Sequence, residues 1–132
     1  MARTSQDVTD AELSILQVLW TLPNAIVRDL TERLYPEGTA AHTATVQKLL
    51  ERLEAKKFIK RNRSVWPHQF TATIEREELI VRQLQSTADR LCEGELQPLL
   101  TSLVKAHGLK ESDRESLRSL LDALDRTGRK KN

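Results

Sequence analysis

Cysteine is nearly absent from this chain, aromatic residues are few, and long hydrophobic runs are missing. Cys92 is the single cysteine among 132 residues, which excludes an intramolecular disulfide and is typical of a reducing cytosol. No apolar run approaches the roughly 20 residues that a transmembrane helix needs. The polar residues at the start of the chain do not resemble a signal peptide. We therefore expect a cytoplasmic protein with no membrane insertion.

The patterns that mark enzymes and metal sites are missing as well. The chain shows no Gly-rich phosphate loop, no nucleophile elbow and no paired carboxylates. His42, His68 and His107 are scattered, and together with Cys92 they show no metal-ligand spacing. We predict that the protein is not an enzyme, that it has no metal site, and that it needs no cofactor.

The clearest positive pattern is an amphipathic helix predicted over residues 41–57. Its apolar residues follow the i, i+3, i+4, i+7 spacing of one buried stripe, at Val46, Leu49, Leu50 and Leu53. Thr43 or His42 is expected to cap its first turn. The opposite face carries small, polar and basic side chains, at Ala44, Gln47 and Lys48, flanked by Thr45 and Arg52. Such a face suits the DNA major groove, where a helix approaches base edges closely while basic side chains meet phosphates.

A basic β-ribbon is predicted directly after this helix, with strands over residues 58–63 and 69–73. Between Lys48 and Arg63 the chain has seven basic and two acidic residues, a balance of +5 in a chain whose total is +2. Charge concentrated in this way is typical of a nucleic-acid interface. We expect Lys60, Arg61 and Arg63 to meet phosphates, which would give affinity and salt dependence rather than base preference. Helix followed by ribbon is the order of recognition helix and wing in a winged helix.

The rest of the chain is predicted to be helical. Helices over residues 9–20 and 27–35 precede the amphipathic helix and complete a helix-turn-helix, and Thr9 and Glu12 form a capping box. Three more helices are predicted over residues 75–92, 96–106 and 113–125, followed by a basic tail expected to be mobile. We predict a mainly α fold with a small β-wing: a winged helix-turn-helix DNA-binding domain over residues 1–74 and a helical dimerisation arm over residues 75–132.

The predicted arm is rich in leucine and has no second layer to cover it. A second copy of the chain would bury this surface, and a helix-turn-helix usually gains specificity from two half-sites. The alternative is a monomer in which the arm folds back on the winged-helix domain of residues 1–74, hereafter the head. The residues expected to form the dimer interface are Leu91, Leu96, Leu99, Leu100, Leu103, Val104, Leu117, Leu120, Leu121 and Leu124.

Two segments carry a resemblance to a known family. T-D-A-E-L-S-I-L-Q-V-L-W at residues 9–20 and T-A-T-V-Q-K-L-L-E-R-L at residues 43–53 resemble the penicillinase repressor, methicillin-resistance repressor and copper-transport repressor family. The resemblance implies a winged helix with a dimerisation arm that binds palindromic operator DNA as a homodimer and blocks transcription. It also implies which residues face the bases, namely Thr43, Ala44, Thr45, Gln47 and Lys48, and that Arg52 faces the backbone.

The chain departs from that family at three places. In the β-lactam branch a membrane sensor-protease is a partner that cuts an Asn-Phe bond in the arm, and Ser102-Leu103 stands at the comparable position here. In the copper branch a cysteine cluster binds metal, whereas Cys92 stands alone. The usual Gly-Arg of the wing tip is replaced by Ser-Val-Trp-Pro. The resemblance therefore supports the fold and leaves the inducing signal open.

Other interpretations of the same residues stay open. Lys48 and Arg52 can form an ordinary solvated helix face. A winged helix can serve as a protein-interaction module that never touches DNA, or as an architectural DNA binder with no preferred sequence. Trp66 on the wing loop either packs on the head or lies against the DNA backbone. Gln47 paired with adenine, or Lys48 with guanine, would supply about 1–3 kcal/mol of base discrimination.

Overall fold

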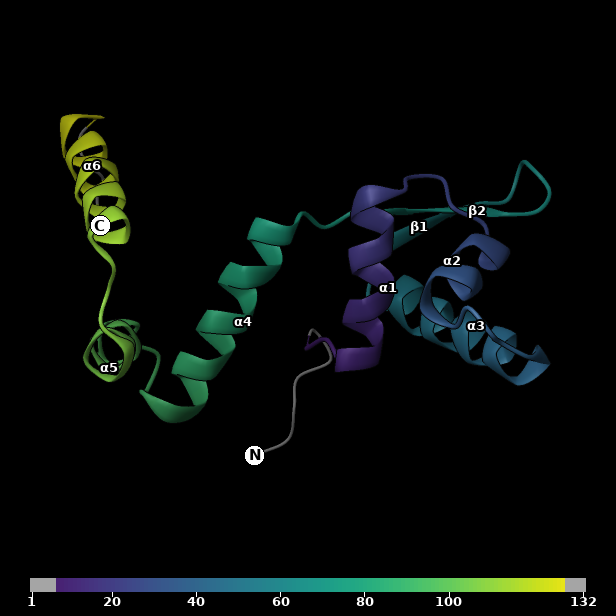
Figure 1. Cartoon of the computed structure of the whole chain (residues 1–132), viewed down its shortest axis with the longest axis horizontal. Coiled ribbons are helices and arrows are strands. Elements are labelled where there is room, and N and C mark those ends of the chain that lie inside the picture. The colour runs from purple at the N-terminus through teal and green to yellow at the C-terminus, as the bar shows by residue number, and fades with distance from the viewer. Residues whose placement is uncertain (1–6, 128–132) are drawn as a thin grey trace. The chain divides into compact units, whose positions relative to one another are not determined.

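The structure is a computed structural model that describes residues 7–127, and in this part of the chain it contains six α-helices and two β-strands. The elements follow in the order α1 (Asp10–Thr21), α2 (Val27–Leu34), α3 (Ala40–Ala55), β1 (Ile59–Asn62), β2 (Gln69–Ala72), α4 (Arg76–Leu91), α5 (Gln97–His107) and α6 (Glu111–Thr127) (Figure 1). The predicted fold class is confirmed. The predicted basic tail starts inside α6, and its residues 128–132 lie outside the described residues, as do residues 1–6.

Contacts divide the chain into two compact units, residues 1–87 and 88–132, so the division falls within α4. The boundary predicted between residues 74 and 75 lies earlier, just before α4 begins. The first unit contains the complete winged helix. The assignment of DNA binding to residues 1–74 and of dimerisation to residues 75–132 stays a prediction.

Helix α1 begins with the predicted capping box. The Thr9 hydroxyl accepts a hydrogen bond from the Glu12 N–H at 3.1 Å, and Glu12 Oε1 accepts one from the Thr9 N–H at 3.0 Å. These two bonds satisfy donors that the first turn of a helix leaves free. The helix then buries Ile15, Leu16 and Leu19 in the core of the head.

Helices α2 and α3 form the helix-turn-helix, and the cap of α3 differs from our prediction. Thr39, rather than Thr43 or His42, precedes the helix, and its hydroxyl accepts a hydrogen bond from the Ala41 N–H at 3.2 Å. His42 Nδ1 accepts one from the Thr39 N–H at 3.1 Å, and its ring stacks on Tyr35 at 4.3 Å between centroids. The helix therefore starts at Ala40, one residue before the predicted range and three residues before Thr43.

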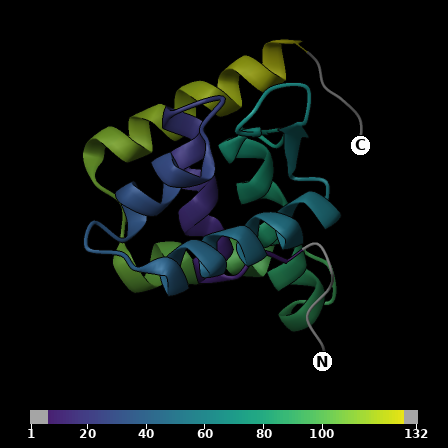
Figure 2. The same cartoon turned by 90° about the vertical axis from the view of Figure 1, so that its right-hand side faces the viewer.

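The core of the head is built where α3 crosses α1 and α2. Figure 2 shows α3 along its whole length on one side of the head. Its predicted apolar stripe is buried, and so are residues from each neighbouring element: Val46, Leu49, Leu50 and Leu53 of α3, Leu30 of α2, and Phe58, Ile59 and Phe70 at the wing. Burying one such side chain contributes about 1.5–3 kcal/mol. The stripe fixes which face of α3 remains outside.

The wing is an antiparallel pair of strands, as predicted, with Ile59 opposite Ala72 and Asn62 opposite Gln69. The loop between the strands contains no glycine; instead Asn62 Oδ1 accepts hydrogen bonds from the backbone and the hydroxyl of Ser64. One further pairing lies outside the hairpin. Ala25, before α2, exchanges two backbone hydrogen bonds with Phe70, at 2.8 and 3.2 Å. These bonds attach β2 to the helix-turn-helix.

The second unit consists of the end of α4 with α5 and α6. Helix α5 has Pro98 in its first turn and ends at His107, and it is capped by Gly108, whose φ of 68° is unfavourable for other residues. Among the residues from Ala88 to Thr127 whose side chains the structure describes, only Ala88 is buried. None of the helices in the described part of the chain is long and apolar enough to cross a membrane.

Candidate nucleic-acid interface

The outer face of α3 presents the side chains predicted to face bases. Ala44, Thr45, Gln47 and Lys48 are exposed, and Thr43 is half-buried at the side of the helix. Small residues lie near the start of this face and the amide and ammonium groups follow within one turn. This arrangement lets the first turns approach another surface closely while longer polar side chains reach past them.

Glu51 belongs to the same surface, although it was not among the residues predicted from the sequence. It is exposed one helical turn after Gln47, and both side chains line the groove between α3 and the wing. A carboxylate in a major groove can accept a hydrogen bond from the amino group of cytosine. The i, i+4 spacing from Gln47 was the signal that could have identified it.

The basic residues of the wing differ in what they touch. Lys60 is exposed, and the Arg63 side chain is 60% exposed although its guanidinium lies 2.9 Å from Glu54 Oε2. The Arg61 side chain is only 22% exposed, with Nε 3.5 Å from Glu54 Oε1 and the guanidinium 4.9 Å above the Phe70 ring. Glu54 of α3 thus holds both arginines. Arg61 joins the wing to α3, whereas Lys60 and Arg63 remain accessible.

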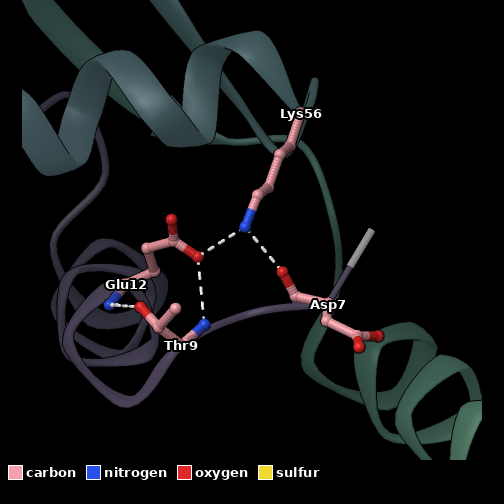
Figure 3. Close-up of polar contacts among 4 residues, drawn as sticks. All are labelled: Asp7, Thr9, Glu12 and Lys56. Carbon is pink, nitrogen blue, oxygen red and sulfur yellow. Dashed lines mark hydrogen bonds and ion pairs between the residues drawn. The ribbon is translucent and has the colours of Figure 1, made fainter. Parts of the chain in front are cut away.

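Lys56 also faces inward, into a polar network at the start of α1 (Figure 3). Its Nζ lies 2.7 Å from Glu12 Oε1 and 2.6 Å from the carbonyl oxygen of Asp7. Burial raises the pKa of the Glu12 carboxyl, but hydrogen bonds from Lys56 and the Thr9 backbone and the charges of Lys56 and Arg52 outweigh it and lower that pKa below its usual value. This lysine therefore serves the fold.

The charge of the interface is smaller than the sequence count indicates. Three of the seven basic residues between Lys48 and Arg63 are paired with Glu12 or Glu54. The other four are exposed, and none of them enters an ion pair found within residues 7–127: Lys48, Arg52, Lys57 and Lys60. The positive surface therefore consists of α3 and the near edge of the wing, with Arg63 in addition.

A groove of about 420 Å³ separates α3 from the wing. Gln47, Leu50 and Glu51 line it from the helix. Arg61, Trp66, Pro67, His68 and Phe70 line it from the wing, with Val27 of α2 at one end. The outer face of α3 and the loop of the wing thus line the same groove from two sides.

In the part of the chain that the structure describes, no three His, Cys, Asp or Glu side chains come together in a way that could hold a metal ion.

Apolar side chains are exposed along the C-terminal helices, at Leu91, Leu96, Leu100, Leu103, Val104, Leu117, Leu120, Leu121 and Leu124, with Leu99 half-buried. An apolar face of this length is unusual on a monomer and typical of an interface.

Three packed helices with a helix-turn-helix, followed by an antiparallel wing, define a winged helix-turn-helix protein. The chain belongs to the penicillinase repressor family, whose sequence model matches residues 8–123. This is a family of transcriptional repressors rather than enzymes, and the resemblance found in the sequence is confirmed.

Two curated sequences are similar to this chain over most of its length. The penicillinase repressor of Staphylococcus aureus is 20% identical over 126 residues, which cover 96% of this chain and 99% of that protein. An uncharacterized 16.5 kDa protein in the ptsI 3' region of Latilactobacillus sakei is 28% identical over 123 residues, covering 93% of this chain and 84% of that protein. Both matches extend across the head and the C-terminal helices.

Proposed function

We propose that this protein is a cytoplasmic repressor that binds a palindromic operator in double-stranded DNA as a homodimer. Each head places α3 in a major groove, with Thr43, Ala44, Thr45, Gln47 and Lys48 facing the bases. Arg52, Lys60 and Arg63 meet phosphates, and Arg61 holds the wing in place for them. The observation that carries this proposal is the exposed outer face of α3, bordered by accessible cations, in a member of a repressor family.

The exposed face has the chemistry that base recognition needs. Gln47 can form two hydrogen bonds with adenine, Lys48 can donate to guanine, and Glu51 can accept from cytosine. The small side chain of Ala44 allows the helix to approach the base edges. Lys60 and Arg63 lie on the wing, where contacts with phosphates would add affinity without distinguishing sequences.

Homodimerisation is supported by the C-terminal helices. Their apolar side chains recur at i, i+3, i+4 and i+7 from Leu96, the residue before α5, to Leu103, with Leu99 half-buried, and again on α6, as in helices that pack against a partner. A second copy presents the same surface, so a two-fold interface would cover both. We therefore assign residues 75–132 to dimerisation, with the ten residues Leu91, Leu96, Leu99, Leu100, Leu103, Val104, Leu117, Leu120, Leu121 and Leu124 as its apolar contacts.

Selection from a pool of random duplex DNA at about physiological salt tests the proposal. We expect a dyad-symmetric consensus whose half-sites lie about one or more helical turns of 10–10.5 base pairs apart. The Lys48→Ala variant should bind that consensus about tenfold more weakly, the loss of one base contact, and should relax the preference at one position of each half-site. Lys105→Ala is the matched control, because Lys105 is an exposed lysine of α5 and lies outside the predicted DNA-binding domain of residues 1–74.

Three outcomes would contradict the proposal. Retention of DNA without enrichment of any sequence would indicate an architectural DNA binder. Absence of binding even at low salt would indicate a protein-interaction module. Enrichment of single half-sites with no symmetric partner would contradict the homodimer and leave the base contacts of α3 in place.

A further inference from the structure

Trp66 is the most exposed large apolar side chain in the described part of the chain, with 84% of its surface open to solvent. It lies on the loop between β1 and β2, and its ring is nearly perpendicular to the His68 ring, 5.1 Å away between centroids. The other tryptophan has partners in the fold: the Trp20 indole N–H donates to the carbonyl of Ile74 at 2.8 Å, and Arg76 lies over its ring. Trp66 is therefore unexplained by the packing of the head.

The groove between α3 and the wing places Trp66 relative to the proposed base contacts. Gln47 on α3 and Trp66 on the wing line the same depression, from opposite walls. The major and minor grooves of DNA are separated by a single sugar-phosphate strand. If α3 lies in a major groove, that strand occupies the depression and the wing tip comes to the adjacent minor groove.

The cations beside the groove favour a nucleic-acid strand over an apolar peptide or ligand. The lining itself is mixed, with Val27, Leu50, Pro67 and Phe70 apolar and Gln47, Arg61 and His68 polar, whereas the exposed Lys60 and Arg63 lie along the wing. Glu51 is the acidic residue of the lining, so the phosphates are expected on the wing side of the groove. The charge of the surroundings thus matches a polyanion, while the tip itself is apolar.

We propose that Trp66 is a specificity-determining residue that inserts its indole into the minor groove beside each half-site. Apolar wedges placed in a minor groove partly unstack a base step and bend the duplex. The cost of this deformation depends on the step, and pyrimidine–purine steps deform most easily. Trp66 would therefore impose a sequence preference at flanking positions that α3 does not touch. This inference rests on the proposed DNA-binding function.

The first test uses a pool with the selected half-sites held constant and the flanking base pairs randomised. Wild-type protein should enrich flexible steps such as TA or CA at fixed distances outside the half-sites. Trp66→Ala should lose the flanking preference, keep the half-site preference and bind about tenfold more weakly, the effect of losing one aromatic contact with bases. Val65→Ala is the matched control, because Val65 is the exposed neighbour on the same loop.

Fluorescence provides the second test. Wild type and Trp66→Phe both contain Trp20, so the difference between their emission spectra isolates the signal of Trp66. On addition of operator DNA this difference signal should be quenched, and Trp66 should become shielded from acrylamide.

The outcomes separate this inference from the function on which it rests. If wild-type protein enriches half-sites and Trp66→Ala retains both the affinity and the flanking preference, Trp66 does not contact the minor groove. The exposed indole would then bind a partner other than DNA. A difference signal that DNA leaves unchanged would overturn the inference in the same way. If wild-type protein enriches no half-site, the proposed function fails first and the role of Trp66 fails with it.

Discussion

Lys56→Met would break the buried ion pair with Glu12 from one side, because methionine keeps the apolar stem of lysine and lacks its ammonium group. Glu12 is 1% exposed, so its carboxylate would keep the Thr9 N–H and lose a partner 2.7 Å away. Removing one member of a buried pair costs about 3–5 kcal/mol. The Lys56 side chain is 19% exposed, which lets water reach the vacated position. We therefore expect a loss of about 3 kcal/mol in the free energy of unfolding at neutral pH.

The pH dependence of this loss follows from the lowered pKa of Glu12. In wild type the ionised carboxylate stabilises the fold fully above the pKa it has in the unfolded chain. That contribution is lost as the pH falls through the lower folded-state pKa. Lys56→Met removes the hydrogen bond and the charge of Lys56, so the pKa of Glu12 should be higher in the folded variant than in folded wild type. Protonation of Glu12 at low pH should then remove part of the destabilisation caused by the substitution. The difference between the two proteins should be largest at neutral pH and should shrink below about pH 4.

Urea denaturation followed by circular dichroism, at one protein concentration, measures the loss of stability and its pH dependence. The concentration is held constant because the proposed dimerisation would contribute to stability. Lys57→Met is the control, since Lys57 is exposed, and it should change stability by no more than about 0.5 kcal/mol. Glu12→Gln combined with Lys56→Met should recover part of the loss by removing both charges. A cost below about 1 kcal/mol, the value of a surface pair, or a difference independent of pH would refute the reasoning.

Two further substitutions test the interface and the arm. Glu54→Gln removes the acid that holds Arg61 and Arg63, so affinity for random duplex should rise and the slope of log affinity against log salt should steepen by about one; weaker binding would contradict this. Leu120→Glu buries a charge in the proposed dimer interface and should raise the dimer dissociation constant at least about 30-fold in analytical ultracentrifugation. Ser119→Glu, on the same helix, should leave the dimer intact.

The helices of the head could be predicted from the sequence because each of them is marked by a pattern that spans only a few residues. The capping box of α1 needs only Thr9 and Glu12, and the buried stripe of α3 repeats within two turns. The cap of α3 was missed although it is equally local. Thr39 lies before the apolar repeat begins, and its partner is a histidine ring rather than the usual Glu or Gln.

Partners distant in the sequence could not be predicted in this way. Lys56 and Glu12 are 44 residues apart, and they meet only because α3 crosses α1. The pairing of Arg61 and Arg63 with Glu54 depends on how the wing folds back on α3. The sequence therefore predicted the exposed face of α3 well and overestimated the number of free cations around it.

The backbone hydrogen bonds between Ala25 and Phe70 hold the wing in position whatever residues its tip contains. They join β2 to the segment before α2 without using any side chain of the loop that follows Asn62. Substitutions in that loop therefore change what the wing displays and leave its root attached to the helix-turn-helix. Under the proposed function, a wing tip with tryptophan and proline in place of glycine and arginine would change the operator preference, while the helix-turn-helix stays unchanged.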